Sequence, residues 1–178
     1  MIYKEAYKFI LSQAGDILNN VDESSVKRSI EIILNSKKTF VYGAGRSGII
    51  GKSFAMRLVQ LGLTAYFIGE TITPIVTDQD SVFLISNTGT TKSTLLVAEI
   101  SKNVGAKIIV LTSNENSPLV KYSDEKILLR GISHNSLAPL GTIFEDSSLI
   151  LLDSIIAQMI QILNQSEEDL RKRHAIWV

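Results

Sequence analysis

The sequence predicts an α/β protein, a three-layer α/β/α sandwich built around a five-stranded parallel sheet. Short apolar runs bounded by Gly, Asn, Asp or Ser have the length and composition of strands that are buried on both faces. They alternate with longer segments in which apolar residues recur at helical spacing, and such alternation is typical of a doubly wound parallel sheet. The predicted strands are Thr39–Gly43, Thr64–Ile68, Ser81–Ser86, Lys107–Thr112 and Lys126–Leu129.

Helices are predicted before, between and after these strands. Asp22 is a suitable N-cap for the second of two N-terminal helices, because its short side chain accepts a hydrogen bond from a backbone N–H that has no helical partner. Gly62 and Gly105 each follow a longer helix and suit the left-handed position at which helices often end. The predicted helices cover about Ile2–Asn19, the segment from Asp22 to about Ser36, Ser47–Leu61, Thr91–Val104, a short stretch near Pro118–Tyr122, and roughly Ile143–Leu163.

The domain organisation is expected to be simple. The 178 residues suffice for one domain with a sizeable core, and no linker, repeat or low-complexity segment divides them. We therefore expect a single domain, in which residues 1–37 form the two N-terminal helices and residues 38–164 form the α/β core. Residues 165–178 form a polar tail in which a short charged helix is expected.

The composition narrows the function classes. Lys plus Arg and Asp plus Glu each number 18, so the net charge is zero and nothing favours binding to nucleic acid or to anionic membranes. The chain has no cysteine, which rules out disulfides, thiolate nucleophiles and cysteine-based metal sites and fits a cytoplasmic protein. Its most apolar stretch, Ser148–Leu163, is interrupted by Asp153 and Gln158 and predicts a buried helix, not a membrane span. A hydrophobic content of 45% indicates apolar surface at subunit interfaces.

The order of the strands predicts where a ligand binds. In five-stranded sheets of this type the order 2-1-3-4-5 is common, so that strands 1 and 3 are neighbours whose crossovers leave in opposite directions. The crevice at their C-terminal ends is the expected ligand site. Two loops rich in small residues, Gly43–Gly48 and Ser86–Thr91, follow these two strands. Each leads from a strand into a helix, where backbone N–H groups can close around an anion.

The first loop, Gly43–Gly48, has the G-x-G-x-x-G spacing of a dinucleotide-binding fingerprint, and the acidic Glu70 follows after the second strand. Against this interpretation, the chain is too short for a nicotinamide site with a separate substrate domain. A structural alternative also stays open, in which the glycines only permit a tight turn and close helix packing. Gly45, Arg46 and Ser47 are candidate ligand contacts, and we expect the Ser47 hydroxyl to start the following helix and to face the crevice.

The second loop places polar side chains around a glycine. Near Gly89 stand three hydroxyls and an amide, those of Ser86, Thr88, Thr91 and Asn87. A phosphate group offers several acceptor oxygens, which hydroxyls and helix N–H groups can satisfy, each bond to the charged group contributing roughly 1.5–3 kcal/mol. The alternative is a cluster of helix-capping residues without a ligand. Together the two loops predict a phosphorylated small molecule held between them.

The second loop resembles that of the SIS (sugar isomerase) domain family, which typically reads Ser-x-Ser-Gly-x-Thr. Here Thr88 keeps the hydroxyl of the second Ser, and Thr90 replaces a frequent Glu. The whole chain is similar to those members of the family that isomerise hexulose 6-phosphates. Where such relatives commonly end in Arg-His-Ala-Asn-Leu-Glu, this chain ends in Ile176-Trp177-Val178. The resemblance extends over Tyr42–Gly48, Phe54–Leu58, Gly69–Thr71, Thr73-Pro74, Pro139–Glu145 and Arg173–Ala175.

The resemblance implies an isomerase that interconverts D-arabino-hex-3-ulose 6-phosphate and fructose 6-phosphate through an enediol. It further implies a place in the ribulose monophosphate pathway, in formaldehyde fixation or pentose phosphate supply. It also implies a homotetramer with active sites at subunit interfaces, and neither nucleic acid nor membrane as a partner. The reaction moves a carbonyl from C3 to C2. It needs a base for the C2 proton and a route for protons between the two oxygens, but no redox cofactor and no metal.

Glu145 is the candidate base. It stands at the start of a long apolar helix, where partial burial would raise its pKa toward neutrality, as removal of a proton from carbon requires. The helix dipole explains a Glu in this first turn equally well, and the resemblance favours catalysis. The resemblance also makes His174 catalytic, as a proton shuttle that the tail carries to a neighbouring subunit. Arg46 is expected to meet the phosphate or sugar hydroxyls, or to pair with an acid at an interface.

Several residues and alternatives stay open at this point. Arg57 is interpreted as structural and His134 as an ordinary loop residue, while Glu70 and Thr73 would line either the pocket or a subunit contact. Besides the isomerase above, the alternatives are another isomerase of the family, acting for example on arabinose 5-phosphate, a non-catalytic sugar-phosphate sensor, and a dinucleotide-binding module.

Overall fold

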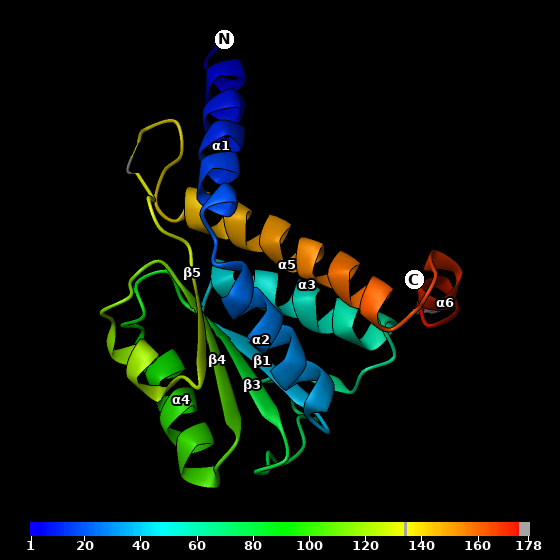
Figure 1. The fold of residues 1–178 in the computed structure, drawn as a ribbon. Coiled ribbons are helices and arrows are strands. Elements are labelled where there is room, and N and C mark those ends of the chain that lie inside the picture. Colours follow the sequence, from blue (N-terminus) through cyan, green and yellow to red (C-terminus); the bar gives the residue numbers. More distant parts are fainter. Residues whose placement is uncertain (134, 175–178) are drawn as a thin grey trace.

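The computed structural model describes residues 1–133 and 135–174 and is drawn in Figure 1. Its centre is the predicted five-stranded sheet, in which all strands are parallel and follow the order β2-β1-β3-β4-β5. Every residue of β3 is buried, as expected for a strand with helices on each side. The strands are β1 Thr39–Gly43, β2 Ala65–Phe67, β3 Ser81–Ile85, β4 Lys107–Thr112 and β5 Glu125–Leu128.

The helices follow the predicted ranges closely, because their ends carry local signals. The Asp22 carboxylate caps the second helix by accepting a hydrogen bond from the Ser24 N–H at 3.0 Å. Gly105 ends the fourth in the left-handed conformation, with φ of 89°. The helices are α1 Ile2–Asn19, α2 Glu23–Asn35, α3 Arg46–Gln60, α4 Lys92–Val104, the 3₁₀ helix η1 Pro118–Tyr122, α5 Thr142–Ile162 and α6 Glu167–Lys172.

Two apolar clusters fill the space on either side of the sheet. On one face, Val41 and Phe83 pack against residues of α2, α3, α5 and the end of α1. On the other face, Phe40 and Leu84 meet α4 and η1. Because neighbouring residues of a strand point to opposite faces, each strand supplies both clusters. The result is the predicted three-layer sandwich, with α3 and α5 on one face of the sheet and α4 on the other (Figure 1).

The register brings the ends of β1 and β3 side by side. Thr39 pairs with Ser81 and Gly43 with Ile85, so the two strands start and stop together. The loops that follow Gly43 and Ile85 therefore leave the sheet at the same edge, which is the edge where the topology predicts a ligand.

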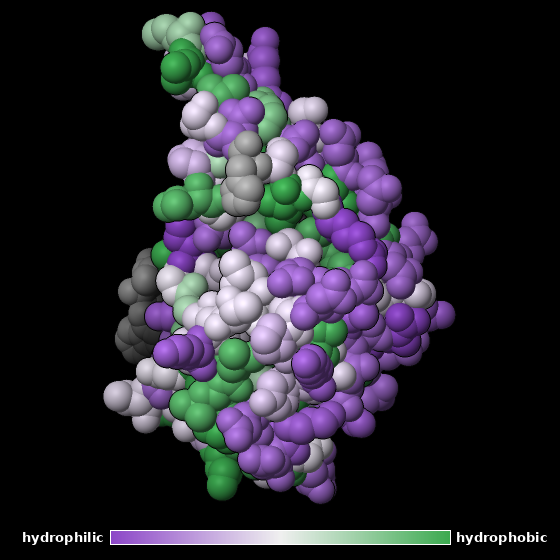
Figure 2. Space-filling model, turned by 90° about the vertical axis from the view of Figure 1, so that its left-hand side faces the viewer, coloured by the Kyte–Doolittle hydropathy of each residue, from purple (hydrophilic) through white to green (hydrophobic). Residues whose placement is uncertain are grey.

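The two ends of the described chain pack differently. The second half of α1 contributes Ala14 and Ile17 to the buried interior, while its first half projects away from the body (Figure 1). Figure 2 shows hydrophobic side chains at the top of the molecule, where α1 projects. At the other end, Leu170 of α6 is buried, and Arg173 donates from Nη1 to the Gln60 carbonyl oxygen at 3.2 Å. None of the helices among the described residues is long and apolar enough to cross a membrane.

Candidate functional site

The loops after β1 and β3 meet at the C-terminal edge of the sheet. The first leads through Gly45 into α3, and the second leads through residues 86–91 into α4. The first N–H groups of each helix have no partner within the helix and carry the positive end of its dipole. The structure therefore brings the two predicted loops together, and each contributes a helix N-terminus that suits an anion.

A tight turn holds the first loop. At Gly48 a Cβ would stand 2.5 Å from the Gly43 carbonyl oxygen, so the start of α3 packs directly on the end of β1. The prediction that the Ser47 hydroxyl starts this helix is wrong. The N-cap is Gly45, whose φ of 58° turns the chain into α3 at Arg46, and Ser47 is buried as the second residue of the helix. What Ser47 offers a ligand is its backbone N–H, one of the first in α3.

The hydroxyls of the second loop bind one another and the loop backbone. Ser86 is buried, and its Oγ accepts a hydrogen bond from the Gly89 N–H at 3.2 Å and lies 3.4 Å from Oγ1 of Thr91. Thr88 and Thr90 are exposed, and their hydroxyl oxygens lie 2.9 Å apart. Ser86 thus shapes the loop from inside, whereas Thr88 and Thr90 present hydroxyls at the surface. Thr90, which stands where the family frequently has a Glu, was not predicted as a site residue.

A third loop, after β4, supports the second and was not predicted as part of the site. The Ser113 hydroxyl donates to the Asn87 side-chain oxygen at 2.7 Å, and the Ser113 N–H donates to the Asn87 carbonyl oxygen at 3.1 Å. Ser117 packs beneath Gly89, where an added Cβ would stand 2.2 Å from the Ser117 Oγ. That Oγ is buried and has no hydrogen-bond partner among the described residues. The strand order was the available signal, since β4 is the neighbour of β3.

Glu145 brings a carboxylate from the start of α5 to the first loop. Its Oε2 lies 2.7 Å from Nε of Arg46. The Glu145 side chain is 13% exposed and the Arg46 side chain 56%, so the ion pair is enclosed on the side of the acid and open on the side of the cation. The Nε–H of Arg46 is not directed at Oε2 of Glu145, and this oxygen accepts no hydrogen bond from the described residues. Two predicted site residues that lie far apart in the sequence are thus in contact.

The environment of Glu145 acts on its protonation in opposite directions. Burial raises the pKa of the Glu145 carboxyl, and the positive charge of Arg46 opposes this rise. The negative charge of Asp146 adds a smaller rise in the same pKa. The effect of burial is the largest, so the pKa of Glu145 lies above its ordinary value. A carboxylate with a raised pKa in a ligand crevice has the character of a general base.

The turn before α5 determines where this carboxylate lies. A Cβ on Gly141, the N-cap of α5, would stand 3.0 Å from Oε1 of Glu145, so the acid folds back over the glycine. Leu140 directly precedes Gly141. It has a φ of 56°, and its side chain is 89% exposed. A leucine in the left-handed region costs about 1–2 kcal/mol. Backbone strain of this kind concentrates at functional sites.

His174 does not approach Glu145 within the same chain. Its neighbour Arg173 binds the Gln60 carbonyl at the end of α3, whereas Arg46 is the first residue of that helix. A helix of 15 residues is about 22 Å long. The tail and the first loop therefore lie at opposite ends of α3, and the prediction that the tail serves a neighbouring subunit stays a prediction.

The remaining predicted residues lie outside the crevice or beside it. Arg57 on α3 forms an ion pair with Asp153 on α5, with 3.7 Å between Nε and Oδ1, which agrees with a structural role. Glu70 is exposed in the loop after β2, and the Thr73 hydroxyl donates to its carbonyl oxygen at 2.7 Å. His134 lies outside the described residues.

A cation beside the second loop was missed by the sequence reasoning. Lys92 is the exposed first residue of α4 and directly follows the hydroxyl-rich loop, which was the available signal. Among residues 1–133 and 135–174, no group of three or more His, Cys, Asp or Glu side chains is placed to hold a metal ion. The site thus combines helix N-termini, hydroxyls and a cation for an anionic ligand with one carboxylate of raised pKa.

Known proteins share this chain's sequence and fold. A model of the SIS domain family matches residues 32–160. The 3-hexulose-6-phosphate isomerase of Methanocaldococcus jannaschii is 43% identical over 145 residues, which cover 82% of this chain and 79% of that protein. The enzyme of the same name from Bacillus subtilis is 33% identical over 175 residues, which cover 90% and 95%. The crystal structure of a hypothetical protein from Methanococcus jannaschii, from which a function as 3-hexulose-6-phosphate isomerase was inferred, superposes with a TM-score of 0.91. The two sequences are 37% identical, and the superposed part covers 98% of this chain and 99% of the other.

Proposed function

The chain belongs to the SIS domain family, and we propose that it is a 3-hexulose-6-phosphate isomerase. The observation that carries the proposal is the contact between Arg46 and Glu145 at the edge where two anion-binding loops meet. It supports the proposal because a carboxylate of raised pKa then stands beside the proposed phosphate site, as the movement of a carbonyl along a sugar phosphate requires. The archaeal and bacterial relatives of that name support the same reaction.

The phosphate of the substrate binds between the two loops. The N–H groups that follow Gly45, among them those of Arg46 and Ser47, face it from α3, and those of α4 face it from the other side. Hydroxyls of the second loop add donors, and Lys92 adds a positive charge. Ser86 and Asn87 hold the second loop in shape through the Gly89 N–H and the Ser113 hydroxyl. The hydroxyls assigned to the phosphate are those of Thr88 and Thr91.

Glu145 takes the proton from C2 of the open-chain 3-ketose. The electron pair of the C2–H bond forms the C2–C3 double bond, and the oxygen on C3 gains a proton, which gives a 2,3-enediol. The hydroxyl on C2 then loses its proton as the carbonyl forms there. The proton held by Glu145 returns to C3, so fructose 6-phosphate forms without an oxidant or reductant.

Arg46 positions the base and responds to the substrate. Before the substrate binds, its guanidinium holds the Glu145 carboxylate, and its exposed face can turn to the phosphate or the sugar hydroxyls. Since the charge of Arg46 lowers the pKa of Glu145, turning Arg46 to the substrate raises that pKa further. The base therefore becomes stronger as the site fills.

A neighbouring subunit supplies His174. Its imidazole moves a proton between the oxygens on C2 and C3, and in the reverse direction it assists ring opening of fructose 6-phosphate. Because this role needs a second copy of the chain at each site, the proposed enzyme is a homo-oligomer, and the family resemblance favours a tetramer. We place this enzyme in the cytoplasm and in the ribulose monophosphate pathway.

Turnover by the purified protein tests the proposed function. Incubation with D-arabino-hex-3-ulose 6-phosphate should produce fructose 6-phosphate, and arabinose 5-phosphate should not be isomerised. Absence of fructose 6-phosphate would contradict the proposal, and turnover of the pentose alone would indicate another isomerase of the family. Thermal unfolding distinguishes binding modules, because a ligand stabilises the folded state by RT ln(1 + [L]/Kd) and so raises Tm only where it binds. A sugar phosphate should raise Tm and a nicotinamide dinucleotide should leave it unchanged.

A further inference from the structure

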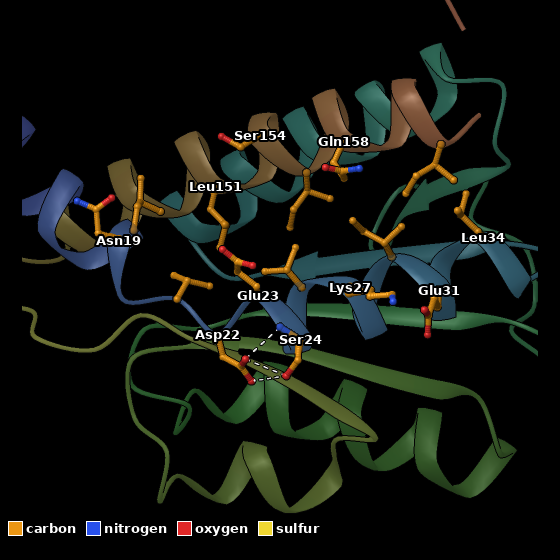
Figure 3. A pocket seen from close by; sticks show the side chains of 16 residues that line it. Asn19, Asp22, Glu23, Ser24, Lys27, Glu31, Leu34, Leu151, Ser154 and Gln158 are labelled. Atoms are coloured by element: carbon orange, nitrogen blue, oxygen red, sulfur yellow. Dashed lines mark hydrogen bonds between the residues drawn. The ribbon is translucent and has the colours of Figure 1, made fainter. Parts of the chain in front are cut away.

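A groove of about 1300 Å³ runs between α2 and α5, beyond the first turns of α5 and apart from the candidate site (Figure 3). Figure 3 shows Ser154 and Gln158 along its α5 side, with Glu23, Lys27 and Glu31 along its α2 side. An elongated apolar groove between two helices is the shape that accepts a third helix. Its apolar lining includes Val26, Ile30, Leu34, Leu151 and Ile155.

α1 carries an apolar stripe that its own chain covers incompletely. The stripe consists of residues that recur every three or four positions and lie on one side of the helix, namely Tyr3, Tyr7, Leu11, Ala14 and Leu18. Ala14 is buried and Leu18 packs against the core, whereas Tyr3, Tyr7 and Leu11 are 57%, 47% and 62% exposed. The same surface thus continues from a packed half of α1 to an unpacked half. Large exposed apolar side chains in one continuous row indicate a protein partner.

The projecting half of α1 matches the groove in length and charge. Residues 3–11 of α1 span about 12 Å, and so do residues 23–31 along the α2 side of the groove. Lys4 and Lys8 flank the stripe at helical spacing. The residues that line the groove include three acids and a single Lys, namely Asp22, Glu23, Glu31 and Lys27. A helix with basic flanks therefore fits an acidic rim, and such complementarity sets partner and register.

The chain cannot place its own α1 in this groove. α1 ends at Asn19, which lines one end of the groove, and Tyr7 lies about 18 Å further along the helix, in the half of α1 that projects away from the body (Figure 1). We propose that the first half of α1 from a second copy of this chain lies in the groove, and that the exchange is mutual. A mutual exchange about a twofold axis occupies the groove and the helix of both copies, so this contact is complete within one pair of subunits. This inference does not depend on which reaction the protein catalyses.

The absence of cysteine from the chain permits a direct test. In the Tyr7→Cys/Gln158→Cys variant, mild oxidation should produce a covalent dimer on a non-reducing gel, and neither single variant should. A dimer formed by Tyr7→Cys alone would show that α1 pairs with α1 of the second copy. Absence of a dimer in the double variant would show that α1 of a second copy does not lie in the groove. Either result overturns the proposal. The matched control is Leu96→Cys/Gln158→Cys, because Leu96, at 57% exposed against 47% for Tyr7, is at least as accessible but lies on α4, and this variant should stay monomeric on the gel.

Charge reversal tests the same contact without a crosslink. Lys8→Glu and Glu31→Lys should each weaken association by about tenfold in sedimentation experiments, and the double variant should recover the original association. Circular dichroism checks that all three variants keep their helices. Unchanged association in both single variants, or no recovery in the double variant, would contradict the proposed pairing.

Discussion

At the scale of single residues, Glu145 works against the stability of its own fold. Its carboxylate is mostly enclosed, its Oε2 accepts no hydrogen bond from the described residues, and its pKa is raised. Arg46 offsets part of this penalty, but from a side chain that is itself half in solvent. A charge kept where burial disfavours it is characteristic of catalytic groups, for which reactivity matters more than stability.

Replacing Glu145 by Gln should therefore stabilise the protein at neutral pH. Because the carboxyl has a higher pKa in the folded chain than its ordinary value of 4.5, the folded state holds the proton longer, and stability falls as pH rises from 4.5 through the raised pKa. The Glu145→Gln variant has no carboxyl at this position, so its stability does not fall in this way as the pH rises. Its Tm advantage over the wild type should grow from about pH 4 to about pH 7, as thermal unfolding can measure. A Tm advantage that shrinks over this range would contradict the assignment.

Replacing Arg46 by Gln should move the pH dependence of catalysis. Loss of the positive charge removes the influence that lowers the pKa of Glu145, so that pKa rises. The acidic limb of the kcat/KM profile should shift to higher pH, because the base is then protonated over a wider range. The matched variant Arg46→Lys keeps the charge and should shift the limb less. If the acidic limb stays at the same pH in Arg46→Gln, the charge of Arg46 does not influence the pKa of the base.

At the scale of elements, the proposed phosphate site is built by three loops that follow neighbouring strands. The loops after β1 and β3 supply the helix N-termini, and the loop after β4 supports the loop after β3 through Ser113 and Ser117. Ser117 lies so close to Gly89 that no side chain fits at position 89. The φ of 64° at this position also favours glycine. The shape of the phosphate loop thus depends on a neighbour that is distant in sequence.

Gly89→Ala should destabilise the fold by about 2–4 kcal/mol, through backbone strain and through the clash with Ser117. In the Ser117→Gly background the clash is absent, and the same substitution should cost only about 1–2 kcal/mol. Urea unfolding of the four variants of this cycle measures both values. Equal costs in the two backgrounds would mean that Ser117 does not constrain the loop.

The elements could be predicted to within a residue because their signals are local. The cap at Asp22, the glycine at Gly105 and the apolar strand cores each mark a boundary without reference to the rest of the chain. The contact between Arg46 and Glu145 could not be predicted in this way, since it depends on how α5 returns to the sheet edge. The misplaced role of Ser47 has a similar cause, because the positive φ of Gly45 moves the helix start by one residue.

At the scale of the whole molecule, the body is packed around one sheet while two segments lie away from the crevice. The first half of α1 projects with an exposed apolar row, and the tail with His174 lies at the end of α3 opposite to Arg46. Both segments gain a role when a second copy is present, α1 as the proposed interface and His174 as the proposed proton shuttle. Catalysis and assembly then both depend on further copies of the chain.

Subunit mixing tests whether His174 acts in the site of a neighbouring subunit. Glu145→Gln and His174→Ala should each be nearly inactive alone, because each removes one proton-transfer group from every site. When the two are mixed and allowed to exchange, about a quarter of the sites should combine an intact Glu145 with an intact His174 from the neighbour, and activity should return accordingly. No recovery in fully exchanged mixtures would place His174 outside the neighbour's site.

Turnover by the Glu145→Gln variant tests the assigned chemistry most directly. Conversion of D-arabino-hex-3-ulose 6-phosphate should lose a factor of about 10²–10⁴ in kcat, since the group that takes the C2 proton is absent. Binding of fructose 6-phosphate, measured by calorimetry, should stay nearly unchanged, because the phosphate is held by the loops after β1 and β3. Near-normal turnover by this variant would show that another group removes the C2 proton.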